Sequence, residues 1–181
     1  MKTLFAKYKS VIKFIATFLS VYIGLTLAYK LYLNVSIESQ YYPDYFTNLV
    51  AHQTQSLLNT IGYTTQIIKH PEEPSMKVII NGNYLLRIIE GCNAISVIIL
   101  FISFVIAFSG KLKTTVFFLL AGSVFIYVVN LIRIVLLSIG LYHYPEQSAI
   151  LHTVVFPAFI YGMVFLLWMF WVNRFSNISR K

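Results

Sequence analysis

The sequence is short of charged residues and contains a single cysteine. Charged side chains make up 11% of the 181 residues, whereas 58% are hydrophobic and 17% are aromatic. One cysteine cannot form an internal disulfide, which excludes a small secreted domain built on disulfides. The apolar and aromatic content excludes a disordered chain, and a soluble domain carries far more charge. With a mean hydropathy of +0.74, the class that remains is an integral membrane protein.

Acidic residues are also few, because six of them stand against 14 basic residues, for a formal net charge of +8. Such an excess indicates nucleic-acid binding when the basic groups form one solvated surface. Here most of them flank apolar stretches, where lysine and arginine anchor the cytoplasmic edge of a membrane protein. We therefore expect contact with membrane lipid and none with nucleic acid.

Four apolar stretches are long enough to cross about 30 Å of hydrocarbon, which takes about 20 helical residues. They cover approximately residues 11–33, 92–109, 114–139 and 150–172. The first is interpreted as a retained span rather than a signal peptide, because its apolar core is too long and no small-residue cleavage pattern follows. We expect residues 1–181 to form a single membrane domain, with residues 34–91 as an insert outside the bilayer.

The orientation follows from the loop charges, since cytoplasmic loops carry the excess of lysine and arginine. The N-terminal segment, the turn between the second and third stretches, and the C-terminal tail contain nine basic residues and no acidic residue (Lys2, Lys7, Lys9, Lys13, Lys111, Lys113, Arg174, Arg180 and Lys181). Both termini are therefore predicted to be cytoplasmic. All six acidic residues and all four histidines then lie on the extracytoplasmic side.

The insert contains signals for a helix and a hairpin. Pro43 and Asp44 offer a helix start and Gly62 a stop, and apolar residues recur between them at helical spacing (Phe46, Leu49, Val50, Leu57 and Ile61). This amphipathic helix is expected either on the outer bilayer surface or packed on the spans. Asn81-Gly82 between two apolar runs predicts a β-hairpin. The predicted fold is thus an all-α polytopic membrane protein with about four spanning helices, an amphipathic helix and a short β-hairpin.

Cys92 follows Gly91 directly and is expected in the first turn of the second span, at the outer surface. A helix N-terminus favours the thiolate form of a cysteine, which is the nucleophilic form. The alternative is a small hydrophobic residue buried among helices, as most cysteines in apolar surroundings are.

Arg133 lies inside the third stretch, about 9 Å below its expected outer end at 1.5 Å per residue. Such an arginine usually faces a polar interior and marks function, although a side chain that reaches the outer headgroups is an alternative. Asn130, three residues earlier on the same helix face, is a candidate to hold the Arg133 guanidinium.

His152 opens the fourth stretch at the outer surface, and His143 in the preceding loop competes with it for a chemical role. A lone interfacial histidine is commonly only a hydrogen-bonded polar tip. The histidines show no metal-ligand spacing and there is no second cysteine, so we expect neither a metal nor another cofactor. Taken together, a thiol, an imidazole and a guanidinium at the outer ends of three spans suit acyl transfer.

Three stretches then resemble the exosortase/archaeosortase family of membrane-embedded cysteine transpeptidases. They are Glu90-Gly91-Cys92-Asn93-Ala94, Asn130-Leu131-Ile132-Arg133-Ile134, and His152 at the start of a helix that carries Gly162. The resemblance implies Cys92 as nucleophile, Arg133 as transition-state stabiliser and His152 as acid and base, with Asn130, Glu90, Asn93 and His143 as supporting candidates. Two departures stand out: long family members have about twice as many spans, and their cysteine is commonly followed by Ser-Gly.

The resemblance also implies a substrate and a location. Family members are thought to recognise a C-terminal sorting signal of exported proteins, made of a short motif, a spanning helix and a basic tail. They cleave it at the outer face of the bacterial cytoplasmic membrane and pass the product to an amine or another acceptor. The sequence specifies neither the motif, nor the acceptor, nor the oligomeric state.

Two other functions compete with this interpretation. The first is a noncatalytic four-helix subunit of an export or assembly complex, whose Arg133 pairs with Glu90 or with a lipid phosphate. The second is a small channel or carrier, which would need polar residues along several helices at mid-membrane depth. Convergence of Cys92, His152 and Arg133 on one outward-opening cleft would favour the enzyme.

Overall fold

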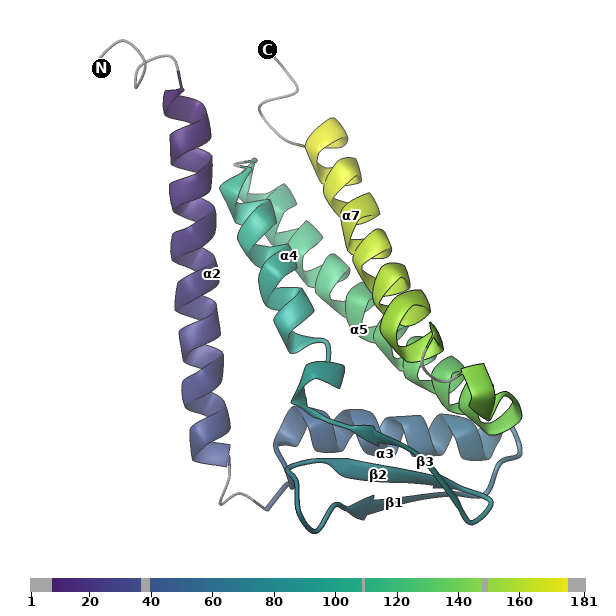
Figure 1. Ribbon diagram of the computed structural model, residues 1–181. Helices are drawn as coiled ribbons and strands as arrows, with labels where there is room; N and C mark the ends of the chain where they lie inside the picture. Colours follow the sequence, from purple (N-terminus) through teal and green to yellow (C-terminus); the bar gives the residue numbers. More distant parts are fainter. Residues whose placement is uncertain (1–7, 37–39, 109, 148–149, 176–181) are drawn as a thin grey trace.

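A bundle of apolar helices carries a small sheet and a crossing helix at one of its ends (Figure 1). The computed structural model describes residues 8–36, 40–108, 110–147 and 150–175, and the side chains of residues 147, 151, 152 and 156 lie outside that description. The bundle contains α2 (Lys9–Ser36), α4 (Ile95–Ala107), α5 (Leu112–His143) and α7 (Phe156–Arg174). The start of α2, the turn from α4 to α5 and the end of α7 lie at the same end of the bundle, opposite the sheet.

Three helices within the described residues are long and apolar enough to cross a membrane, namely Lys9–Ser36, Leu112–His143 and Thr153–Arg174. They correspond to the first, third and fourth predicted spans. Within the second predicted span, 92–109, the structure has the shorter helix α4, which comprises 13 residues. At 1.5 Å per residue α4 is about 20 Å long, less than the hydrocarbon thickness. Four complete spans are therefore not confirmed.

Helix α5 is longer than the predicted third span, because it continues to His143. Ten residues, or about 15 Å, therefore separate Arg133 from the helix end, rather than the 9 Å expected from the sequence. The last turns of α5 pack under the insert, where Ile134 and Val135 are buried with residues of α3 and the sheet. This packing extends the helix beyond its apolar stretch.

The predicted amphipathic helix is present as α3 (Tyr45–Thr60). Asp44 caps it, since its Oδ1 accepts hydrogen bonds from the amides of Phe46 and Thr47 at 3.0 Å each. The predicted buried face is partly wrong, because Leu57 and Ile61 are exposed. The face that packs on the sheet instead alternates small polar and apolar residues at helical spacing (Thr47, Val50, Ala51, Thr54 and Leu58).

The insert also contains a three-stranded antiparallel sheet of β1 (Thr65–Lys69), β2 (Met76–Ile80) and β3 (Asn83–Ile88), in that order. The β2–β3 hairpin is confirmed, and Asn81 and Gly82 have the positive φ values, 50° and 83°, that a type I′ turn requires. Strand β1 was not predicted, so the insert contains a three-stranded sheet where the sequence indicated a hairpin. Its five residues show only one buried position, which gives a weak alternation signal.

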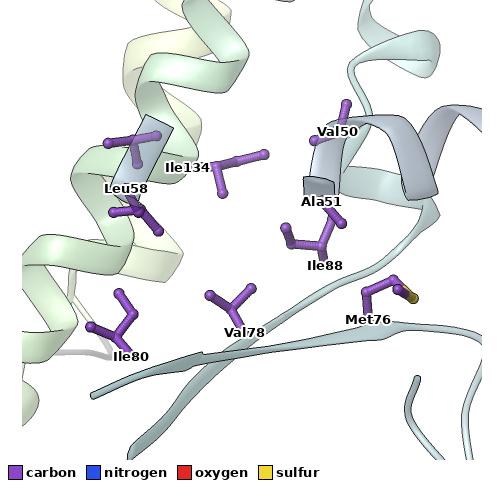
Figure 2. Close-up of a cluster of buried hydrophobic side chains, with 9 residues drawn as sticks. Val50, Ala51, Leu58, Met76, Val78, Ile80, Ile88 and Ile134 are labelled. Atoms are coloured by element: carbon purple, nitrogen blue, oxygen red, sulfur yellow. The ribbon is translucent and has the colours of Figure 1, made fainter. Parts of the chain in front are cut away.

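Two apolar clusters hold the molecule together. In the first, side chains of β2 and β3 meet α3 and the outer part of α5 (Figure 2), with Val78, Ile80, Ile88 and Val50 fully buried. The second joins α4, α5 and α7 around Phe101 and Trp171. Gly122 allows the close approach of α5 to α4, because an added Cβ would lie 2.3 Å from Cζ of Phe101. Cys92 lies on the chain between these clusters.

Candidate active site

A pocket of about 210 Å³ lies where the sheet meets the helix bundle, and Cys92 and Arg133 both line it. One wall comes from the end of β3 and the turn that follows, and another from α5. Pro157 near the start of α7 closes a third side. The remaining lining residues are Leu86, Arg87, Ile88, Ile89, Gly91, Ile134 and Leu137. Three elements distant in sequence thus converge on the free thiol.

Cys92 occupies a 3₁₀ turn, η1 (Glu90–Cys92), and not the first turn of α4 as predicted. Its amide donates to the carbonyl of Ile89 at 2.8 Å, and α4 begins only at Ile95. The expected activation of the thiol by a helix N-terminus is therefore not supported by the structure. The thiol is unpaired in a disulfide and partly buried, as a pocket nucleophile must be.

Asn130 fixes the backbone at the cysteine. Its Nδ2 donates to the carbonyl oxygen of Cys92 at 2.7 Å, and the residue is buried with 2% of its surface exposed. The hydrogen bond that the structure gives Asn130 is to Cys92, and the expected contact of Asn130 with the Arg133 guanidinium stays a prediction. The spacing argument placed Asn130 on the correct helix, but its partner comes from a distant turn that periodicity does not reveal.

Asn93 anchors the turn from the other side and is fully buried. Its Nδ2 donates to the hydroxyl of Tyr29 on α2 at 2.7 Å and to Oγ1 of Thr47 on α3 at 3.2 Å. Its Oδ1 accepts from the amide of Ile95 at 3.0 Å. Ala94, next to it, adopts a left-handed conformation with φ of 67°. Sequence reasoning missed Tyr29 and Thr47, and only their polarity within apolar surroundings distinguished them.

Arg133 is partly buried in α5, and its Nε is buried with no hydrogen-bond partner among the described residues. Within the same part of the chain the ion pair present joins Arg87 to Glu73 and leaves Arg133 out. A buried N–H without a partner costs about 1–3 kcal/mol. Four other buried side-chain atoms among the described residues share this state (Thr54 Oγ1, Thr65 Oγ1, Ser75 Oγ and Trp168 Nε1).

The two candidate histidines differ in their surroundings. His152 lies in the π-helical segment η3 (Leu151–Val155), which leads into α7 and to the pocket residue Pro157. The position of the His152 side chain lies outside the described residues. His143 is exposed at the end of α5, where its Nε2 and the Tyr63 hydroxyl are hydrogen-bonded at 3.0 Å. His143 does not line the Cys92 pocket.

Glu90 belongs to the same turn as Cys92 but does not line the pocket. It is exposed and borders two neighbouring hollows, one of them with Lys30 and Asp44 and the other with Arg87 and Glu73. Glu90 therefore lies beside the pocket of the thiol rather than in it, and its supporting role stays a prediction.

The fold and the pocket together define a class of protein: a multi-pass membrane protein of apolar helices, with a free cysteine and an arginine that has no ion-pair partner among the described residues, both lining a pocket between the bundle and a small sheet. A sequence model of the transmembrane exosortase family matches residues 11–173. The chain therefore belongs to the exosortase family, a family of cysteine transpeptidases. No curated protein matches the chain, and no solved structure does.

Proposed function

We propose that the chain is a cysteine transpeptidase that cleaves a C-terminal sorting signal of exported proteins at the outer face of the bacterial cytoplasmic membrane. The observation that supports this most is that Cys92 and Arg133, from a turn and from the middle of a different helix, line the same pocket. A thiol and a cation at one site are the groups that acyl transfer requires.

The reaction has two steps. In the first, His152 takes the thiol proton while Sγ of Cys92 attacks the scissile carbonyl carbon, whose oxygen becomes an oxyanion. The carbonyl then re-forms, and the C–N bond breaks as His152 passes that proton to the leaving amine. The products are a thioester on Cys92 and the released sorting helix. In the second step an acceptor amine attacks the thioester and loses a proton to His152, the C–S bond breaks, and His152 returns the proton to the departing thiolate, which restores the thiol. Water in place of the amine would give hydrolysis.

Arg133 has the properties of the oxyanion partner. Its unpaired Nε–H would gain a hydrogen bond when negative charge develops on the substrate oxygen, and a bond formed only then lowers the activation barrier. Asn130 and Asn93 are positioning residues, since they hold the backbone on either side of the thiol and do not line the pocket.

The noncatalytic subunit fits the structure less well. It requires Arg133 to pair with Glu90 or with lipid, yet no such pair with Glu90 occurs in the described residues. Arg133 instead faces a protein pocket that contains the thiol.

The test is processing of an exported protein that ends in a short motif, a spanning helix and a basic tail, followed by its change in mass. Cys92→Ser and Cys92→Ala should leave the precursor intact, and Arg133→Lys should lose most activity, because lysine lacks the planar fork of donors. His152→Ala should slow processing strongly, whereas the matched change His143→Ala should have little effect. Normal processing by Cys92→Ala would contradict the proposal.

A further inference from the structure

Strand β3 is an edge strand that ends at Ile88, four residues before the nucleophile, and Ile89 continues it in an extended conformation. The sheet order is β1-β2-β3, and among the described residues no strand pairs with the outer edge of β3. The chain passes from Ile88 through Ile89 directly into the turn Glu90–Cys92 (Figure 1). Free edges present unpaired amide and carbonyl groups, which bind extended peptides by strand addition.

The register shows which backbone groups of β3 point outward. In an antiparallel pair the hydrogen-bonding groups of successive residues point to alternate sides of the strand. The amide of His70 donates to the carbonyl of Ser75, so the backbone hydrogen-bonding groups of Ser75, and of Lys77 two residues later, face β1. The backbone hydrogen-bonding groups of Met76 and Val78 therefore face β3. The corresponding groups of their partners in β3, Ile88 and Leu86, face β2.

The backbone groups of Arg87 and Ile89 must then point to the free edge. The carbonyl of Ile89 is occupied by the amide of Cys92. The amides of Arg87 and Ile89 and the carbonyl of Arg87 are left for an external partner, with the spacing of two residues that strand pairing needs.

A groove follows this edge. The Cys92 pocket shares Arg87, Ile89 and Gly91 with a neighbouring hollow of about 420 Å³, which is lined also by Glu73, Pro74 and Glu90. The two hollows therefore adjoin along the outward residues of β3. Charged side chains of both signs and main-chain groups border the second hollow, which suits a polypeptide better than a lipid tail.

We propose, resting on the function proposed above, that the outer edge of β3 is the docking strand for the substrate. An extended segment that precedes the scissile bond pairs with Arg87 and Ile89 and delivers its carbonyl to Cys92. The spanning helix of the substrate follows the scissile bond, so the preceding segment lies on the sheet side of the pocket. Because this segment and β3 both run toward Cys92, the two strands are parallel.

The experiment uses the full-length protein in lipid nanodiscs and measures alkylation of Cys92 by peptidyl chloromethyl ketones. The thiolate displaces chloride and forms a stable thioether, so no turnover or natural substrate is needed. Acetyl-alanyl chloromethyl ketone reports access to the thiol, and acetyl-pentaalanyl chloromethyl ketone reports the added effect of an extended chain. We expect the longer probe to react at least tenfold faster. Equal rates for the two probes would overturn the docking strand.

A second series tests the backbone pairing in the unchanged protein. Each probe carries one N-methyl group, which removes one amide donor of the extended chain. We expect the length effect to be lost for methylation at every second residue and kept at the positions between, because alternate amides face β3. A uniform effect at all positions would contradict strand pairing.

Protein variants locate the edge. Arg87→Pro removes an outward amide without removing a bond within the sheet, whereas Arg87→Ala removes only the side chain and its ion pair with Glu73. We expect Arg87→Pro to lose most of the length effect relative to Arg87→Ala. Lys69→Pro is the matched control, since Lys69 lies on the opposite free edge, in β1. Loss of the length effect in Lys69→Pro, or its retention in Arg87→Pro, would contradict the proposal.

The short probe separates this proposal from the proposed function. The length effect is the ratio of the long-probe rate to the short-probe rate within each variant, so a change in the reactivity of the thiol itself cancels from the comparison. If Cys92 reacts with neither probe, the nucleophile itself fails. If it reacts with the short probe and gains nothing from length, the transpeptidase proposal stands and the docking strand fails.

Discussion

The side-chain amide of Asn130, in the middle of α5, donates a 2.7 Å hydrogen bond to the backbone carbonyl of Cys92. The bond is partly buried and joins the helix of the candidate oxyanion partner to the turn of the candidate nucleophile. The position of the Cys92 backbone relative to α5 therefore depends in part on this amide.

Loss of this hydrogen bond should impair catalysis. Asn130→Leu keeps the approximate volume but leaves the Cys92 carbonyl without its donor, at a cost of about 1–3 kcal/mol. If the lost bond lets Cys92 move from its reactive position and so raises the activation free energy by this amount, processing should slow by about tenfold or more. Ser103→Ala is the control, because Ser103 is equally buried and hydrogen-bonded to Ile99 on α4. Melting temperatures measured beside the processing rates separate a loss of stability from a loss of positioning, and a processing rate for Asn130→Leu equal to that for Ser103→Ala would argue against a positioning role for Asn130.

Ala94→Gly should change the stability of the protein little. Ala94 has a φ of 67°, a left-handed conformation that costs a residue with a Cβ about 1–2 kcal/mol. Glycine removes this cost, but it adds unfolded-state entropy and loses a methyl group that is buried in the second apolar cluster. These effects offset one another, and the melting temperature should change by less than about 2 °C.

The same substitution elsewhere should cost more. Ala121 is exposed in the interior of α5, and Ala121→Gly should lose about 1 kcal/mol of stability, although it removes no buried methyl group. Thermal unfolding in detergent measures both variants. A decrease for Ala94→Gly as large as that for Ala121→Gly would show that the backbone at Ala94 is not strained.

Gly122→Ala should destabilise the bundle. The new Cβ would lie 2.3 Å from Cζ of Phe101, so α4 and α5 must separate, and such overpacking costs about 1–3 kcal/mol. Phe101→Leu in the same chain should recover part of the loss. Gly24→Ala on α2 meets nothing within 4 Å and should be neutral or stabilising. The melting temperatures of Gly122→Ala, of the double variant with Phe101→Leu, and of Gly24→Ala test this prediction. An unchanged melting temperature for Gly122→Ala would contradict the close approach of the two helices.

The topology remains a prediction with a direct test. The start of α2, the α4–α5 turn and the end of α7 lie at one end of the bundle, and the basic residues near them indicate the cytoplasmic side. Reporter fusions after Lys181 and within the α4–α5 turn should be active only in the cytoplasm. A fusion in the β2–β3 turn should be active only outside. The reverse pattern would place the pocket on the cytoplasmic side.

Local signals in the sequence predicted the elements with local causes. Asp44 caps α3 with its own side chain, and Asn81-Gly82 accepts the positive φ values of the hairpin turn. The apolar runs of α2, α5 and α7 exceed the length needed to span a bilayer. Each of these features is decided by a few neighbouring residues, which a single sequence contains.

What the sequence did not predict depends on partners far along the chain. Hydropathy extended the second span over Cys92, but the hydrogen bonds of Asn93 to Tyr29 and Thr47 hold residues 90–94 in turns instead. The partner of Asn130 is likewise a backbone atom in another element. Residue types therefore identified Cys92 and Arg133 as candidates, whereas their shared pocket required the fold.

The central claim is that Cys92 forms a thioester with the substrate. Intact-mass measurement of the purified protein, incubated with an exported protein that carries a sorting signal and quenched in acid, tests it directly. We predict an added mass equal to the cleaved substrate without its sorting helix, removable by hydroxylamine and absent from Cys92→Ala. Cleavage of the substrate by Cys92→Ala, or by wild-type protein with the adduct on another residue, would contradict the account.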